Sequence, residues 1–162
     1  MSTESENKNH STETKEFSEV IHAQGHTNVS ARHASTLEVT SDDWLTPAGD
    51  CILAIDADRV PSDFDTEFIQ ACQSPSAIIT ATITVESEAV GTHTEKITGS
   101  GSPQLSFDNN RSHVARTSTY TDDRTVLVDG DTAAADIDRD MIDALTTGAK
   151  LTLELSVTIQ AD

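Results

Sequence analysis

Basic residues are scarce in this sequence. Only 10 lysines and arginines stand against 28 aspartates and glutamates, which gives a formal net charge of −18. Nucleic-acid binding requires neutralisation of phosphate charges, so this balance opposes a nucleic-acid partner. An acidic surface that is poor in lysine is typical of proteins kept soluble in concentrated salt, because salt screens repulsion between like charges. We therefore expect a halophilic protein.

Cysteine is scarce, and long apolar runs are absent. Cys51 and Cys72 lie within or next to apolar runs and have no CxxC spacing, which predicts reduced, buried thiols rather than a disulfide or a zinc site. No basic segment leads into an apolar one as in a secretion signal, and no apolar run approaches the length needed to cross a bilayer. The expected location is the cytoplasm, without a membrane partner.

Motifs that carry known chemistry are missing as well. The sequence holds no Gly-rich phosphate loop, GxSxG elbow or HExxH stretch. Asp56-x-Asp58 and Asp129-x-Asp131 resemble carboxylate pairs that bind Mg²⁺ or Ca²⁺. In an Asp-rich chain, strand ends and helix caps explain these residues without a metal. We expect no metal and no cofactor, and the sequence alone does not say what the protein does.

Regular structure is expected to start near Phe17. The segment from Met1 to Lys15 has no apolar side chain after the initiator, so residues 1–16 are predicted to be a disordered polar tail. Residues 17–162 are predicted to form a single β-sandwich domain. Strands are expected at 29–39, 51–55, 77–85, 90–98, 113–120, 124–128 and 151–159, and helices from about 62 to 72 and from 135 to 145.

Most of these strands follow one another without a helix between them. This order favours a predominantly antiparallel β-sandwich of about eight strands with two short helices over a doubly wound parallel sheet. Residues 56–72 also align with residues 129–145 at an offset of 73, and the apolar faces of both helical segments coincide. The sequence therefore predicts a duplicated strand-helix-strand unit, with residues 51–86 similar to residues 124–159.

Polar side chains with reactive potential concentrate between Gly25 and Cys51. We predict a ligand-binding site formed by this stretch together with one later arginine: His26, Asn28, Arg32, His33, Thr36, Glu38, Asp50 and Arg124.

Several readings of this stretch remain open. A metal site of His26, His33, Glu38, Asp50 and Cys51 is conceivable. However, His33 and Glu38 are five residues apart and fall on opposite faces of an unbroken strand, unless a bulge intervenes. The simpler interpretation is a hydrogen-bonded histidine at the core edge and a solvated glutamate.

Two functional hypotheses follow. In the first, the protein is a non-catalytic domain that binds a small anionic ligand or a protein partner, because arginine forks suit carboxylate or phosphate and Arg111 to Arg116 adds positive charge. The alternative for any one arginine is ordinary surface ion pairing. In the second hypothesis, a small hydrolase or isomerase uses His26 or His33 as general base near Glu38 or Asp50. The absence of an evident nucleophile favours the first.

The expected geometry is specific. The turn after Gly25 and the turn from Pro47 to Asp50 should meet, and the strand from Cys51 should run antiparallel beside strand 29–39. Arg124 occupies the position of Cys51 in the repeat, so we expect it to contact Glu38 or Asp50. Replacement of Arg124 by alanine should then be more damaging than replacement of Arg59, which is expected on the surface.

An ordered set of residues supports a family resemblance: Gly25-His26-x-Asn28-Val29-x-Ala31-x-His33-x-x-Thr36-x-Glu38-x-Thr40, then Leu45-Thr46-x-x-Gly49-Asp50-Cys51-Ile52, then Arg124 and Ala133-Ala134-Ala135-Asp136-Ile137-Asp138. From about Phe17 to Ile159 the sequence resembles the uncharacterised archaeal family called Domain of Unknown Function 371. The resemblance implies a small archaeal domain with a jelly-roll-like β-sandwich, and it implies no activity.

Overall fold

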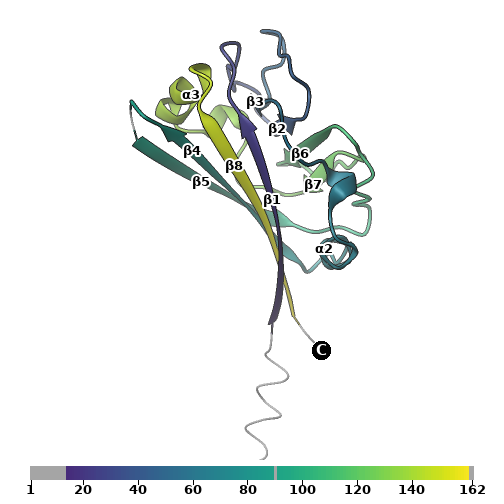
Figure 1. The fold of residues 1–162 in the computed structure, drawn as a ribbon. Helices are drawn as coiled ribbons and strands as arrows, with labels where there is room; N and C mark the ends of the chain where they lie inside the picture. The colour runs from purple at the N-terminus through teal and green to yellow at the C-terminus, as the bar shows by residue number, and fades with distance from the viewer. Residues whose placement is uncertain (1–13, 90, 161–162) are drawn as a thin grey trace, which may run out of the picture.

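Eight strands form two four-stranded sheets in a computed structural model, which describes residues 14–89 and 91–160 (Figure 1). The larger sheet is antiparallel throughout, in the order β1 (Thr14–Gln24), β8 (Lys150–Gln160), β4 (Ile78–Ser87), β5 (Gly91–Ser100). The smaller sheet has the order β3 (Ile52–Ala54), β2 (Thr36–Thr40), β6 (Ser112–Arg116), β7 (Thr125–Leu127). The predicted β-sandwich is confirmed.

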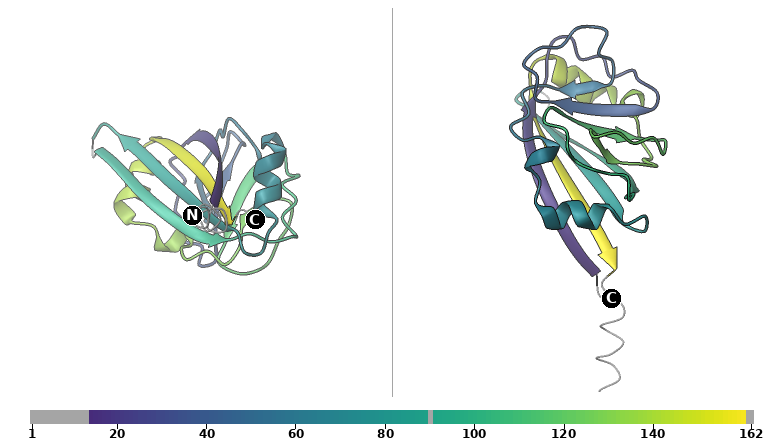
Figure 2. Two further views of the ribbon diagram at one scale, coloured as in Figure 1. Left: turned by 90° about the horizontal axis from the view of Figure 1, so that it is seen from below. Right: turned by 90° about the vertical axis from the view of Figure 1, so that its right-hand side faces the viewer.

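Alternation of apolar and polar residues explains how the layers pack. On β4 the inward residues Ile79, Ala81 and Ile83 are buried, while the threonines between them are only half-buried. Two short helices, α2 (Thr66–Cys72) and α3 (Arg139–Thr146), complete the same hydrophobic core. Figure 2 shows the long strands of the larger sheet and the short strands of the smaller sheet as separate layers. No helix within the described residues is long and apolar enough to span a membrane.

Each helix is preceded by a 3₁₀ turn. In the first turn, Pro61–Asp63, the Asp63 carboxylate accepts a hydrogen bond from the backbone N–H of Val60. In the second turn, the Asp136 carboxylate accepts a hydrogen bond from the backbone N–H of Ala133. The helix predicted to begin after Ser62 therefore begins later, and its N-cap is Asp65.

The predicted duplication is present and is larger than predicted. The order β3, 3₁₀ turn, α2, β4 recurs as β7, 3₁₀ turn, α3, β8. Upstream, β1 and β2 correspond to β5 and β6 at an offset of 76, as in the equivalent bridges Gln24 to Ile55 and Ser100 to Val128. Among the described residues, the four non-glycine residues with positive φ also form equivalent pairs: Ala31 with Phe107, and Asp56 with Asp129.

The two halves are interlocked rather than side by side. Strand β1 of the first half pairs with β8 of the second, and β5 of the second half pairs with β4 of the first. Gly25 lies against the Leu145 carbonyl at the end of α3, and Gly101 lies against the Cys72 carbonyl at the end of α2. Each half therefore completes its structure with a strand of the other half.

Three expectations are corrected. The strand expected at 29–39 is confined to Thr36–Thr40, because Ala31 has a φ of 51° and breaks the extended backbone. Strand β3 runs parallel to β2, not antiparallel, since the chain crosses back before β3 begins. Strand β1 starts at Thr14, so residues 14–16 belong to a strand; the rest of the predicted tail, residues 1–13, lies outside the described residues.

Candidate functional site

The outer face of the smaller sheet carries a polar cluster. Cross-strand pairing places Glu38 beside Val114 and Thr36 beside Arg116 on this face, while Leu37 and its partner Ala115 point into the core. Glu38 and Arg116 are nevertheless only 9% and 8% exposed. Charged side chains this buried are normally paired, so their partners decide what the face can do.

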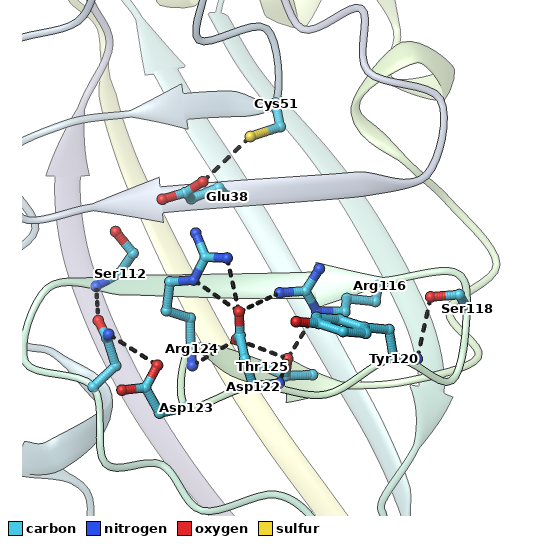
Figure 3. A network of polar contacts seen from close by, with 11 residues as sticks. Glu38, Cys51, Ser112, Arg116, Ser118, Tyr120, Asp122, Asp123, Arg124 and Thr125 are labelled. Atoms are coloured by element: carbon cyan, nitrogen blue, oxygen red, sulfur yellow. Dashed lines mark hydrogen bonds and ion pairs between the residues drawn. The ribbon is translucent and has the colours of Figure 1, made fainter.

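Arg116 and Arg124 converge on one carboxylate (Figure 3). Arg124 Nη2 lies 2.8 Å and Arg116 Nη2 lies 3.1 Å from Asp122 Oδ2. Arg116 Nε also donates to Thr125 Oγ1 at 2.8 Å, and its guanidinium stacks 4.7 Å from the Tyr120 ring centroid. The pair thus connects β6 with the loop that leads into β7.

The two guanidinium groups determine the charge state of Asp122. Burial by itself raises the pKa of this carboxyl, but the hydrogen bonds from Arg124 and the charge of Arg116 outweigh burial and lower the pKa to about 2. Asp122 is therefore ionised at any physiological pH, and it compensates one of the two arginine charges.

Glu38 and Cys51 form the other part of the cluster. Cys51 Sγ donates to Glu38 Oε1 at 3.2 Å. Burial and the neighbouring Glu38 charge raise the pKa of the Cys51 thiol to about 12. Because the thiolate is the reactive form of cysteine, this environment opposes a nucleophilic role for Cys51.

Both candidate histidines accept backbone hydrogen bonds in turns. His26 Nδ1 accepts the Asn28 N–H at 3.0 Å, and His33 Nδ1 accepts the Thr36 N–H at 3.2 Å. In the other half, the equivalent acceptors are Ser102 Oγ and Asn109 Oδ1. Serine and asparagine accept the equivalent backbone N–H groups. These turns therefore need a hydrogen-bond acceptor and not an imidazole.

This equivalence makes a prediction for His33. His33→Asn should leave the free energy of unfolding nearly unchanged, because Asn109 already caps the equivalent turn. His33→Ala should lower it by about 1 kcal/mol through the loss of the acceptor. Urea denaturation at fixed salt measures both; equal losses in the two variants would show that the imidazole itself is needed.

The remaining predicted residues lie around the cluster. The two turns meet as predicted, since Asn28 Nδ2 donates to the Leu45 carbonyl at 2.7 Å and the Asp50 carbonyl accepts the N–H groups of Arg32 and His33. Thr36 Oγ1 lies 2.9 Å from His33 Nδ1. The Arg32 side chain is exposed. The structure therefore groups Thr36, Glu38 and Arg124 on one face and leaves the others in the adjoining turns.

The partner predicted for Arg124 is corrected. Its guanidinium is bonded to Asp122, not to Glu38 or Asp50, although the Glu38 charge lies near enough to contribute to its raised pKa after Asp122. Sequence reasoning missed Asp122, Thr125 and Tyr120. The signal was local: the Asp122 N–H bonds to Thr125 Oγ1, and the Thr125 N–H bonds to the Asp122 carbonyl, in a compact Asp-x-x-Thr turn.

No three His, Cys, Asp or Glu side chains among residues 14–89 and 91–160 are arranged to hold a metal ion. Both cysteines are free; Cys72 is buried and Cys51 is half-buried. What distinguishes the face is therefore its arginine pair.

Comparison with known proteins gives two findings. The sequence profile described as Domain of unknown function (DUF371) matches residues 21–158. An uncharacterised protein of Methanocaldococcus jannaschii, MJ0206, is 38% identical over 138 residues, which is 85% of this chain and 98% of that protein.

Proposed function

Because the chain belongs to the archaeal family described as Domain of unknown function (DUF371), whose description assigns no activity, we propose a function from the geometry of the site. We propose that the protein is a non-catalytic domain that binds a small anionic ligand, a carboxylate or a phosphate, at Arg116 and Arg124.

One observation carries this proposal. Two guanidinium groups share a single carboxylate, and Arg116 Nη2, although buried and 3.1 Å from Asp122 Oδ2, has no well-aligned hydrogen-bond acceptor within the described chain. A guanidinium offers five N–H donors in a planar fork, and Asp122 and Thr125 use only part of the two forks. A ligand oxyanion supplies the missing acceptors in the bidentate geometry that arginine favours.

The geometry gives less support to catalysis. The enzyme hypothesis uses His26 or His33 as general base, but the Nδ1 atom of each ring is already an acceptor in a turn. The thiol of the cluster, Cys51, has a pKa raised to about 12. The acceptor nitrogens of both histidines are thus already engaged, and Cys51 remains a protonated thiol, so the structure offers no general base at these three residues.

Tyr120 provides a local test of the proposal, because it is the single tyrosine of the chain and lies on Arg116. Titration with inorganic phosphate or citrate at constant ionic strength should shift the Tyr120 ring signals in a saturable way. Arg124→Ala should weaken binding at least tenfold, since half of the donor set is lost. Arg32→Ala, which removes an exposed arginine, is the matched control. Equal affinity in the two variants, or no saturation, would refute the proposal.

We also propose that the protein works in a cytoplasm of concentrated salt. The support is the formal net charge of −18 together with only 10 basic residues. Screening of this self-repulsion should raise the unfolding temperature by several degrees as KCl is increased. Sucrose of equal osmolality controls for solute exclusion; the same gain in sucrose would argue against a charge effect.

A further inference from the structure

A cavity of about 430 Å³ lies between α3 and the hairpin of β4 and β5. His93, on the same face of β5 as the buried Ile97, points its ring towards the interior and lines the cavity. Its Nε2 atom is buried and has no hydrogen-bond partner within the described part of the chain. Such a buried polar atom is rare unless something else satisfies it.

The internal duplication shows what this space holds in the other half. The residue equivalent to His93 is Phe17, which packs against the core. The correspondence is fixed by the neighbouring glutamates: Glu19 accepts the Asp65 N–H before α2, and Glu95 accepts the Asp138 N–H before α3. The first half thus has the phenylalanine ring of Phe17 at this position. The second half has the imidazole of His93, whose Nε2 has no partner among the described residues, beside a cavity.

The walls of the cavity are acidic. Besides His93 they include Asp140 and Asp143, one turn apart on α3, and Thr147. The equivalent residues of α2 are Glu67 and Gln70, so the second half has one more carboxylate at this place. An ammonium group fits these walls, because it donates N–H bonds to a neutral imidazole nitrogen and pairs with carboxylates.

A second hollow of about 620 Å³ adjoins the first and shares Ser87, Ala89 and Thr147 with it. Its lining includes Glu86 and Glu88, and also Lys150, which is paired with Glu86 across β4 and β8. The two hollows therefore present separated carboxylates joined by small side chains, with one lysine, Lys150, beside Glu86. A ligand with two positive ends matches this pattern better than a single cation does.

We infer that the space between α3 and the β4–β5 hairpin is a binding site for an aliphatic di- or polyamine. One ammonium group lies against His93, Asp140 and Asp143, and the methylene chain passes Ala89 and Thr147 towards Glu88, because Lys150 already lies beside Glu86. This site is distinct from the arginine pair on the smaller sheet, and it takes a ligand of opposite charge.

The test is a titration with 1,4-diaminobutane at constant ionic strength, followed by NMR of the His93 ring and the α3 amides. We expect saturable shifts confined to these signals. His93→Phe copies Phe17 and should weaken binding at least tenfold while the protein stays folded. Asp143→Asn should also weaken binding severalfold, and it provides a second variant if His93→Phe fails to fold.

Glu67→Gln on α2 is the matched control, because it removes a carboxylate from the equivalent place in the other half. Its affinity should equal that of the unmodified protein. Unchanged binding in both His93→Phe and Asp143→Asn would overturn the inference. So would shifts spread over many surface carboxylates that equal concentrations of NaCl reproduce, since these indicate screening rather than a site.

Discussion

Gly101→Ala is expected to destabilise the fold by about 3 kcal/mol or more, because the new methyl group has no room. A Cβ at this position overlaps the Cys72 carbonyl oxygen at the end of α2. The Ser102 N–H donates to that same carbonyl at 3.0 Å, so the backbone cannot move away without losing the bond. Gly25→Ala should behave alike, because its Cβ overlaps the Leu145 carbonyl at the end of α3.

Gly148→Ala is the control for this prediction. Gly148 has a φ of +86° but open space around its Cα, so alanine there introduces backbone strain without a collision. The expected loss is about 1 kcal/mol. Chemical denaturation of the three variants in the same salt measures the difference. Losses of equal size at Gly101 and Gly148 would mean that the contact between the halves is not tight.

Arg59→Ala is expected to destabilise the protein by about 2 kcal/mol, more than Arg124→Ala, which reverses the ranking expected from the sequence. Arg59 Nη1 lies 2.7 Å from Glu19 Oε1, and Glu19 is 5% exposed. Removing one partner of a buried pair leaves an uncompensated charge. The expected loss in free energy of unfolding is smaller here, because Arg59 is one-third exposed to solvent. The Arg59 guanidinium also donates a hydrogen bond to the Asp63 carbonyl and lies over the Phe64 ring.

Arg124→Ala should lower the free energy of unfolding by about 1 kcal/mol. Its side chain is 40% exposed, and Asp122 keeps Arg116 as a partner. Thermal denaturation of both variants beside Arg32→Ala, an exposed arginine, checks the order. A greater loss in Arg124→Ala than in Arg59→Ala would contradict it and would make the arginine pair the stronger structural element.

The sequence did not reveal the ion pair between Arg59 and Glu19, for an instructive reason. Arg59 follows Asp58 in a polar segment, and nothing local marks its partner, since Glu19 is 40 positions earlier in the chain. Glu19 is on β1, which reaches this place only by pairing with β8 of the other half. A contact between residues so distant in sequence depends on strand order, and alternation within a strand carries no information about strand order.

The sequence by itself determined the properties that depend on neighbouring residues. Alternation in β4 and β8 predicted the strands, helical spacing around Phe68 and Met141 predicted the helices, and the coinciding apolar faces of residues 56–72 and 129–145 predicted the repeat. These patterns work because side-chain periods are fixed by local backbone geometry.

Only the tertiary structure decided the exchange of strands between halves, the parallel pairing of β2 with β3, and the convergence of Arg116 and Arg124 on Asp122. It also showed that His33 accepts a turn hydrogen bond as Asn109 does in the other half. His93 lines a cavity at the position where the first half has Phe17 packed against the core. Each of these depends on which distant backbone edges meet, and that choice is made by the burial of the whole core rather than by any segment alone.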